Sequence, residues 1–497
     1  MASKIRELQF RNFNGGLNTR DNPSEIAPNE IPDAINVTID DRGGAQKRLG
    51  YVDRFGAQVG TGLVSNLFYW ATRGWLVEQI GTGMHVNNGA AFLTWSTSAR
   101  CGMTEFLGNL ILIHPVDGMR IYDGTTVTSP AGAPAGSTVA TWQNRVWASQ
   151  VATPRIWYSA IGDPTSWPGT NWVDIREKNS GEVVCLAGAG GLDVSGRPGL
   201  LAFKQDSAYR IYDSATGAYN TIDPAQGAAS NISAVSVLGR TYVVNTDGIF
   251  STDGLEPLEL RSGLIENIFH KDQINQNRPD LFAAGRFHNR LHFSIPKAGE
   301  TANSISFELE PTQGWIMRHT NAASAYAAIG DNVSQETAFG SPSAQGRIYN
   351  MNVGGSDAGA AITSRLQTYW LEPNGGNKTR IRRARFVGLG SFSATLLSDF
   401  STSQGGISLN IVIDEDAPLY DAVDATYDGD DVYGPTAFQA HRDFWSLGVY
   451  RQVSVLIEET SSLTTGGRTL IDGITAPEQG AWTLAYVSLL SIDLGFH

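Results

Sequence analysis

The sequence predicts an all-β protein: a β-propeller of about seven blades, possibly six to eight, with an extended N-terminal arm and a C-terminal antiparallel β domain. Three observations predict this fold. A short hairpin signature returns about seven times, Asn-Gly and Asp-Gly pairs recur at a constant spacing within it, and 55 of the 497 residues are glycine. That glycine content exceeds the roughly 7% average and favours a turn-rich chain.

The hairpin signature consists of a glycine, four strand-like residues and an Asn-Gly or Asp-Gly pair. Clear copies span 83–89, 118–124 and 248–254, and looser copies begin at Pro154, Ser207, Gly314 and Gly346. Asn-Gly and Asp-Gly tolerate the positive φ of tight turns, so they join antiparallel strands readily. Self-similarity at a period of roughly 40–50 residues is typical of propeller blades. The two longest intervals, after Pro154 and Gly248, predict either loop insertions or a hidden further blade.

A more apolar strand precedes several copies of the signature, as at 110–114, 200–204 and 241–245. A buried strand followed by a shorter, half-exposed one suits a propeller blade. The alternative is an ordinary β-sandwich with many glycine turns, which would not require the recurrence.

The chain divides into three expected regions. Residues 1–50 are polar and proline-punctuated, so we expect an arm that wraps its own propeller or a neighbouring subunit. Residues 51–355 carry the repeating pattern of the propeller. Residues 356–497 form the third region, in which longer strands are expected at 364–370, 378–389, 407–413, 451–458 and 481–492.

The charge balance restricts the function. A net charge of −13 and a pI near 5.1 argue against a nucleic-acid clamp, because such proteins neutralise phosphates with Lys and Arg. The two cysteines, Cys101 and Cys185, are expected to be buried apolar thiols in a reducing cytoplasm. The N-terminus lacks the apolar core of a signal peptide, and no apolar run is long enough to cross a bilayer.

Several runs resemble the tail proteins of short-tailed phages. Residues 13–20 (Phe-Asn-Gly-Gly-Leu-Asn-Thr-Arg), with 31–37 and 43–48 after them, are similar to the family's N-terminal pattern. That pattern has an aromatic-x-Gly-Gly-Leu-Asn start, then an acidic residue and an Asn before a strand, and then a basic strand. Residues 144–167 and 382–390 resemble two further stretches of the family, the second in its C-terminal sheet.

The resemblance implies the tail nozzle, also called tail tubular protein B. Members of this family form a hexameric ring below the adaptor protein of the portal. They retain or conduct the genomic DNA without binding it specifically, and they hold tail fibres or spikes. The implied location is the virion tail, assembled in the host cytoplasm.

The sequence predicts a protein that is not an enzyme, with no catalytic residue, cofactor or metal. His288 and His292 are expected on the polar face of one strand, about 13 Å apart, which is too far for a shared ion. The acidic residues between 414 and 431 are expected to form a solvated loop. They lack EF-hand spacing, although a Ca²⁺ site or a channel lining stays open. No nucleophile elbow, sialidase box or phosphate-binding loop is present.

The candidate site residues are therefore contact residues. For subunit or adaptor interfaces they are Phe13, Leu17, Trp167, Trp172, Arg380 and Arg382. Aromatic anchors concentrate interface energy, and the basic strand suits a salt-bridged face between subunits better than a phosphate site. For an acidic channel lining they are Asp414, Asp416, Asp428, Asp430 and Asp431. Two other readings remain: a glycan-binding or glycan-cleaving receptor module, and a monomeric protein-interaction propeller.

Overall fold

Antiparallel sheets of four strands follow one another along the first two thirds of the chain. They are seen in a computed structural model that describes residues 5–58, 60–178, 181–192, 198–330, 335–343, 345–372, 379–398, 407–413, 441–450, 452–459 and 483–493. Two compact units are present. One contains residues 52–312 and 319–351, and the other contains residues 1–51, 313–318 and 352–497.

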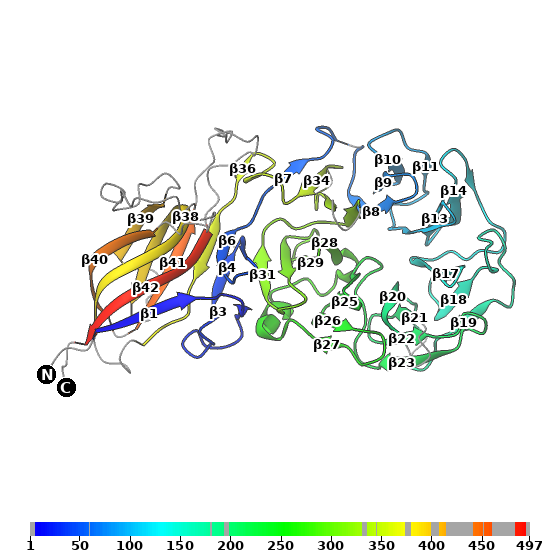
Figure 1. The fold of residues 1–497 in the computed structure, drawn as a ribbon. Helices are drawn as coiled ribbons and strands as arrows, with labels where there is room; N and C mark the ends of the chain where they lie inside the picture. The colour runs from blue at the N-terminus through cyan, green and yellow to red at the C-terminus, as the bar shows by residue number, and fades with distance from the viewer. Residues whose placement is uncertain are drawn as a thin grey trace, which may run out of the picture. The chain divides into compact units, whose positions relative to one another are not determined.

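Blades 1 to 3 are each a sheet of four consecutive strands (Figure 1). Blade 1 contains β8 (Val64–Trp70), β9 (Trp75–Ile80), β10 (Gly83–Val86) and β11 (Leu93–Thr94). Blade 2 contains β12 (Gly102–Phe106), β13 (Asn109–His114), β14 (Gly118–Tyr122) and β15 (Val127–Thr128). Blade 3 contains β16 (Val139–Trp142), β17 (Arg145–Ser149), β18 (Arg155–Tyr158) and β19 (Trp172–Asp174).

Blades 4 to 6 repeat the same strand order. Blade 4 contains β20 (Cys185–Leu192), β21 (Pro198–Phe203), β22 (Ala208–Ile211) and β23 (Tyr219–Asp223). Blade 5 contains β24 (Ala234–Val237), β25 (Arg240–Asn245), β26 (Gly248–Thr252) and β27 (Glu259–Leu260). Blade 6 contains β28 (Ala283–Phe287), β29 (Arg290–Ile295), β30 (Ile305–Leu309) and β31 (Ile316–His319).

Blade 7 closes the ring with a strand from the beginning of the chain. Its order is β32 (Tyr326–Ile329), β33 (Glu336–Gly340), β34 (Ile348–Met351) and then β7 (Tyr51–Asp53), followed by β35 (Ser356–Asp357) and β36 (Ala360–Ala361). Arg54 donates its backbone N–H to the Ile348 carbonyl at 2.9 Å, and Arg347 pairs with Asp53. The first strand of each blade contacts the first strand of the next, and β32 contacts β8. The fold is therefore a β-propeller of seven blades, as the sequence predicts.

The hairpin signature is the third strand of a blade together with the turn that follows it. Asp123 shows why it recurs: its Oδ1 accepts the backbone N–H groups of Thr125 and Thr126 and so caps the turn. Asp213 and Asp253 cap the equivalent turns of blades 4 and 5. One copy was assigned wrongly, because Gly314 precedes β31, the fourth strand of blade 6, whereas the third strand of that blade is β30.

Loop insertions explain the long interval after Pro154 and most of the one after Gly248, which the wrongly assigned copy at Gly314 also lengthens. Between blades 5 and 6 the chain forms two 3₁₀ segments, η1 (Gly263–Phe269) and η2 (Pro279–Leu281). In blade 3 a long connection separates β18 from β19. Neither interval contains an additional blade.

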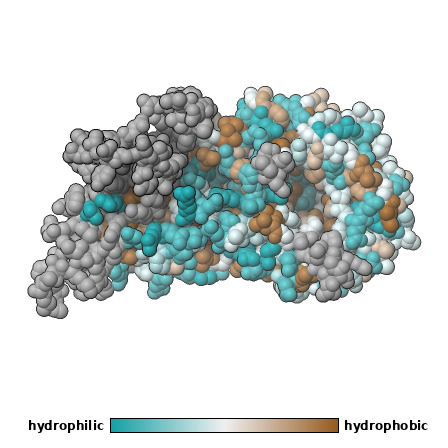
Figure 2. Space-filling view, in the orientation of Figure 1, coloured by the Kyte–Doolittle hydropathy of each residue, from teal (hydrophilic) through white to brown (hydrophobic). Residues whose placement is uncertain are grey.

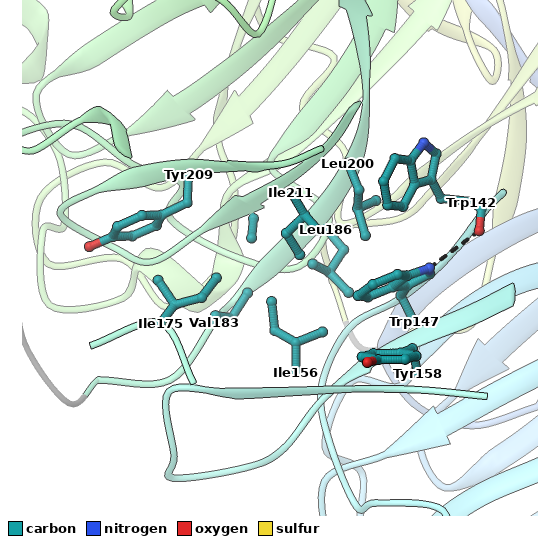
Figure 3. Packing of buried hydrophobic residues seen from close by; sticks show 11 residues of the cluster. Trp142, Trp147, Ile156, Tyr158, Ile175, Val183, Leu186, Leu200, Tyr209 and Ile211 are labelled. Atoms are coloured by element: carbon teal, nitrogen blue, oxygen red, sulfur yellow. Dashed lines mark hydrogen bonds between the residues drawn. The ribbon is translucent and has the colours of Figure 1, made fainter. Parts of the chain in front are cut away.

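Hydrophobic clusters between neighbouring blades hold the propeller together. Figure 3 shows the cluster where blade 3 meets blade 4, in which the rings of Trp147 and Tyr158 pack together beside Ile156 and Leu200. The indole N–H of Trp147 donates to the Trp142 carbonyl at 3.2 Å, so the buried ring keeps a polar partner. Each such side chain contributes roughly 1.5–3 kcal/mol when it is buried.

The other unit is built on a ten-stranded sheet whose longest strand is β38 (Thr379–Ser398). The first half of β38 pairs with β40 (His441–Tyr450) and β42 (Thr483–Asp493). The second half of β38 pairs with β39 (Ile407–Ile413) and β41 (Val453–Glu459). Five of these elements, including β37 (Ser364–Gln367), overlap the strands predicted from sequence; β40 was not predicted.

Residues 1–50, expected as an extended arm, supply short strands to this same unit. β1 (Ile5–Arg11) pairs with β42, β4 (Asp33–Ile35) pairs with β37, and β6 (Ala45–Lys47) lies between β42 and β5 (Val37–Ile39). A separate parallel pair joins β2 (Gly16–Leu17) to β3 (Glu30–Ile31).

Candidate functional site

The two ends of the propeller differ in what they carry. Turns between the first and second strands of the blades lie at one end, which we call the turn face. The connections that lead from one blade to the next lie at the other end, which we call the connector face. Functional sites of a propeller are expected on these faces or on its axis, because the flanks of the sheets are packed against each other.

Arg100 spans the propeller axis at the connector face. It lies just before blade 2, yet its Nε donates to the Ser65 carbonyl of blade 1 at 2.7 Å. Its Nη1 donates to the Asp280 carbonyl at 2.6 Å, just before blade 6, and lies 3.4 Å from the Ser230 hydroxyl, just before blade 5. Nη2 lies 3.5 Å from the Ser324 carbonyl, just before blade 7. One side chain can reach so many blades of a seven-membered ring only at its centre.

Asn231 and Asn66 complete this axial network. Asn231 donates to the Ser137 carbonyl at 2.7 Å, and Asn66 donates to the Cys101 carbonyl at 2.7 Å. Burial lowers the pKa of Arg100 to about 10, so the guanidinium stays charged at neutral pH. Buried carbonyls need hydrogen-bond donors, and here the donors belong to side chains from other blades. The network therefore links the blades to one another and occupies the axis at this end.

A second polar cluster is buried inside blade 6. Glu308 accepts hydrogen bonds from Arg290 at 2.7 Å and from His319 at 2.9 Å. Hydrogen bonding to His319 and these cationic neighbours hold the pKa of Glu308 below its usual value, despite the opposing effect of burial. His292 faces Glu308 across the β29–β30 ladder, and burial lowers the pKa of His292 to about 4.

This cluster corrects the sequence interpretation of the two histidines. His288 lies in the β28–β29 turn with φ of +52°, and His292 is buried at 2% exposure rather than lying on a polar face. Glu308 and His319, which approach this region from other strands, carried no sequence signal. Within the described ranges no group of three or more His, Cys, Asp or Glu side chains has a metal-binding arrangement.

Phe13 and Leu17, predicted as interface anchors, fill the interior of their own unit. Each side chain is only 1% exposed, so in this fold neither can contact another subunit. Between them Gly16 adopts φ of +71°, and a Cβ there would lie 2.7 Å from the Cβ of Trp315. Close packing therefore accounts for the second glycine of the aromatic-x-Gly-Gly-Leu-Asn run.

The polar residues of the same N-terminal patterns form a buried network that the sequence did not reveal. Asn36 accepts a hydrogen bond from Arg48 at 2.8 Å, and Arg48 forms a bidentate pair with Asp357. Lys47 lies 3.0 Å from Glu459, and both side chains are almost completely buried. These ion pairs join the first 50 residues to strands more than 300 residues later in the chain.

Of the two predicted tryptophan anchors, only Trp172 is exposed. Trp167 is buried in the core between blades 2 and 3, where its indole N–H donates to the Pro164 carbonyl. Trp172 begins the outermost strand of blade 3 and is 37% exposed. The Arg155 guanidinium lies 3.8 Å from its ring centroid and is fixed by Asp174, so this indole is held in one orientation.

Two of the remaining candidates, Arg380 and Arg382, lie in β38. Arg380 pairs with Val449 and Ile492 across the ladders of β38, while Arg382 lies at a register shift in both ladders. The shift interrupts the regular two-residue alternation along this basic strand. Asp414, Asp416, Asp428, Asp430 and Asp431, proposed as the channel lining, all lie outside the described residues.

Both cysteines are buried free thiols, as predicted. Burial raises the pKa of Cys101 and of Cys185 to about 12, so neither is a reactive thiolate near neutral pH. Among the helical segments that the structure describes, none is long and apolar enough to span a membrane.

The chain is thus a seven-bladed β-propeller protein with an additional β-rich unit. No protein-family model matches it, and no curated protein matches it either. Similar solved structures include BBS1N in complex with ARL6DN, at 10% identity and a TM-score of 0.41, covering 63% of this chain and 99% of that one. Another is the extracellular domain of the one-component system BT4673 from B. thetaiotaomicron, at 10% identity and a TM-score of 0.44, covering 92% of this chain and 62% of that one.

Proposed function

We propose that the chain is a structural subunit of a short-tailed phage virion. In this role it forms the ring-shaped tail nozzle below the portal adaptor, retains and conducts the genome, and provides the attachment point for fibres or spikes. The ring is a homo-oligomer, six subunits by family resemblance, assembled in the host cytoplasm and located in the virion tail.

The run from Phe13 to Arg20, with the Asn36 and Lys47–Arg48 patterns that follow, carries this proposal. Short resemblances are weak when their residues are scattered on a surface. Here the matching residues are buried: Phe13 and Leu17 in the interior, Arg48 paired with Asn36, and Lys47 paired with Glu459. Because buried and paired residues are constrained by the fold, a match at such positions supports common ancestry better than a match at surface positions.

The proposed mechanism is geometric and electrostatic. Each subunit carries a net charge of −13, so a ring of them presents negative potential to polyanionic DNA, which then slides without tight binding. Heterologous contacts that close into a ring generate the channel. Because Arg100 occupies the axis of each propeller, the proposed conduit runs between subunits rather than through a single propeller.

We further propose that the role is not enzymatic and needs no cofactor. The glycan-binding or glycan-cleaving alternative requires a carbohydrate site, and the monomeric interaction module requires a lasting single-chain state. The experiment described next distinguishes both alternatives from the tail-nozzle function.

Electron microscopy of the intact particle made by the genome that encodes this chain tests the proposal. The expected result is a ring below the portal into which copies of the seven-bladed unit fit, in particles whose protein content includes this chain. Purified particles that lack the chain would overturn the proposal. Hydrolysis of a host polysaccharide by the purified chain would replace it with the glycan-cleaving alternative.

A further inference from the structure

One side of the blade 6 sheet is polar and yet buried. Figure 2 shows a mostly hydrophilic outer surface, where polar side chains meet water. Blade 6 instead encloses polar side chains within the propeller. Each of them is at most 5% exposed: His292, Ser294, Ser306, Glu308 and His319. The opposite side of β29 and β30 is apolar and equally buried, as Phe293 and Phe307 show.

Tyr326, the first residue of β32, shows that the polar side of blade 6 lies against blade 7. The Tyr326 hydroxyl lies 2.6 Å from the Ser294 hydroxyl. The Tyr326 ring packs on Gly285, where a Cβ would lie 2.3 Å from the Cβ of Tyr326. Gly285 and Glu308 flank His292 on the two neighbouring strands. We call this contact between blades 6 and 7 the polar seam.

Hydrogen bonds cross the polar seam. The Thr337 hydroxyl donates to the Arg286 carbonyl at 2.7 Å, and the His288 backbone N–H donates to the Gln335 side chain at 2.7 Å. In the described part of the chain, hydrophobic clusters fill five other contacts between neighbouring blades, namely 1–2, 2–3, 3–4, 4–5 and 7–1. A buried polar contact is stable only while its members are satisfied, so the polar seam is the more sensitive to a change in charge.

His292 is the member of the polar seam whose hydrogen bonding is incomplete. Its side chain is almost fully enclosed, and neither ring nitrogen has a hydrogen-bond partner among the described residues. Burial lowers the pKa of His292 to about 4, so the ring is neutral near neutral pH. The carboxylate that faces it, Glu308, already accepts hydrogen bonds from Arg290 and His319.

A protonated His292 would find little compensation for its charge. The charged and titratable groups that face it are Glu308 on β30, His319 on β31 and Tyr326 on β32, with Arg290 on its own strand, while β28 contributes Gly285. Burial raises the pKa of Tyr326, so its hydroxyl stays neutral. The Tyr326 ring centroid lies 6.3 Å from that of His292, just beyond the roughly 6 Å within which a ring attracts a cation. The imidazolium would therefore compete with Arg290 and His319 for one carboxylate.

We infer that the polar seam is an acid-sensitive joint, at which blades 6 and 7 separate when His292 takes up a proton. Separation hydrates the imidazolium, and the hydrogen bonds that crossed the seam are replaced by bonds to water. The other blade contacts stay closed, because apolar burial does not depend on protonation. The propeller thus responds to acid at one defined place. The inference depends on the propeller alone and goes beyond the proposed function.

Hydrogen–deuterium exchange of the full chain, followed by mass spectrometry at pH 6.5 and pH 4.5, tests the joint. If His292 regains its ordinary pKa of 6.5 in the opened seam, the opened population rises about 40-fold between these two pH values. With labelling times scaled to the intrinsic exchange rate, β28 and β32 should lose protection by a similar factor. β16 and β17 of blade 3, which lie at hydrophobic blade contacts, should keep their protection.

Substitution of the histidine separates its titration from other effects of acid. His292→Phe and His292→Gln cannot take up the proton, so both should lose most of the acid response at β28 and β32. The two replacements differ in polarity, so a response that both lose reflects the missing proton rather than a change in packing. His288→Asn is the matched control: His288 is exposed in the β28–β29 turn of the same blade, and asparagine tolerates its left-handed φ. This variant should keep the full response.

Two results overturn the inference. One is a loss of protection at pH 4.5 that is equal in blade 3 and at the polar seam, because acid then unfolds the propeller as a whole. The other is an acid response of β28 and β32 that both His292 variants retain. If neither variant folds, the wild-type comparison of the polar seam with blade 3 decides by itself.

Discussion

Replacing Glu78 with glutamine should stabilise the propeller at neutral and alkaline pH and leave it unchanged in acid. Glu78 lies in the middle of β9 on the same face as Leu76 and Ile80, which pack against residues of blade 7. Its side chain is fully enclosed, and among the described residues neither carboxylate oxygen accepts a hydrogen bond of good geometry. Burial raises the pKa of Glu78 to about 8, an effect that the backbone N–H of Asn88, the Arg54 cation and the backbone N–H of Asn87 offset only in part.

The sign and size of the effect follow from proton linkage. Below pH 4.5 the carboxyl group is protonated in both the folded and the unfolded chain, so it has no effect on the pH dependence. As the pH rises, the unfolded chain loses this proton first, and folding stability falls by about 1.4 kcal/mol per pH unit until the folded group also ionises near pH 8. The accumulated loss is of the order of 3 kcal/mol at pH 7 and 4–5 kcal/mol above pH 8. Glutamine has nearly the same shape and cannot ionise, so Glu78→Gln removes this loss.

Urea unfolding of the wild type and of Glu78→Gln, followed by tryptophan fluorescence at several pH values between 4 and 9, measures the difference directly. The gap in free energy of unfolding should be near zero at pH 4 and widen toward pH 8, with unchanged m-values. Glu256→Gln, at an exposed position, is the control and should show no such gap. A gap that does not change with pH, or a variant less stable than the wild type at pH 8, would refute the reasoning.

Three further predictions concern the networks described above. Arg100→Met should destabilise the propeller by about 3 kcal/mol in urea unfolding, because several buried oxygens lose their donor, and Arg100→Lys should fall between it and the wild type. Lys47→Met should lower the unfolding free energy of the other unit by about 3–5 kcal/mol. The double variant Lys47→Met with Glu459→Leu should recover most of that loss, which a calorimetric comparison would detect. Ellman's reagent should label neither Cys101 nor Cys185 in the native chain and both in guanidinium chloride; rapid native labelling would contradict their burial.

The blade repeat could be predicted because its signal is local. Asp123, Asp213 and Asp253 each cap a turn two or three residues further on, so the sequence itself carries the motif. The first strands of the blades gave no comparable signal. The ring that they form depends on contacts between blades, and segments such as Gly102–Phe106 have neither a turn motif nor clean alternation.

The axial network and the buried ion pairs could not be predicted for the same reason. The partners of Arg100 lie 35, 130, 180 and 224 residues away from it. Lys47 and Glu459 lie at opposite ends of the chain. Phe13 and Trp167 were predicted as surface anchors because sequence gives the apolar character of a side chain but not the side of the fold on which it lies.

Closure of the axis by Arg100 bears on any role in which the protein conducts DNA. A guanidinium that donates to the Ser65 carbonyl of blade 1 and to the Asp280 carbonyl beside blade 6 cannot leave without exposing buried acceptors, so opening this axis would cost several lost hydrogen bonds. Duplex DNA is also far wider than a space that one arginine side chain can bridge. A conduit made by this chain must therefore be lined by surfaces that several copies bring together. Its electrostatic character depends on the outer surfaces of the two units, where most of the charge of −13 resides, rather than on the residues that line the propeller axis.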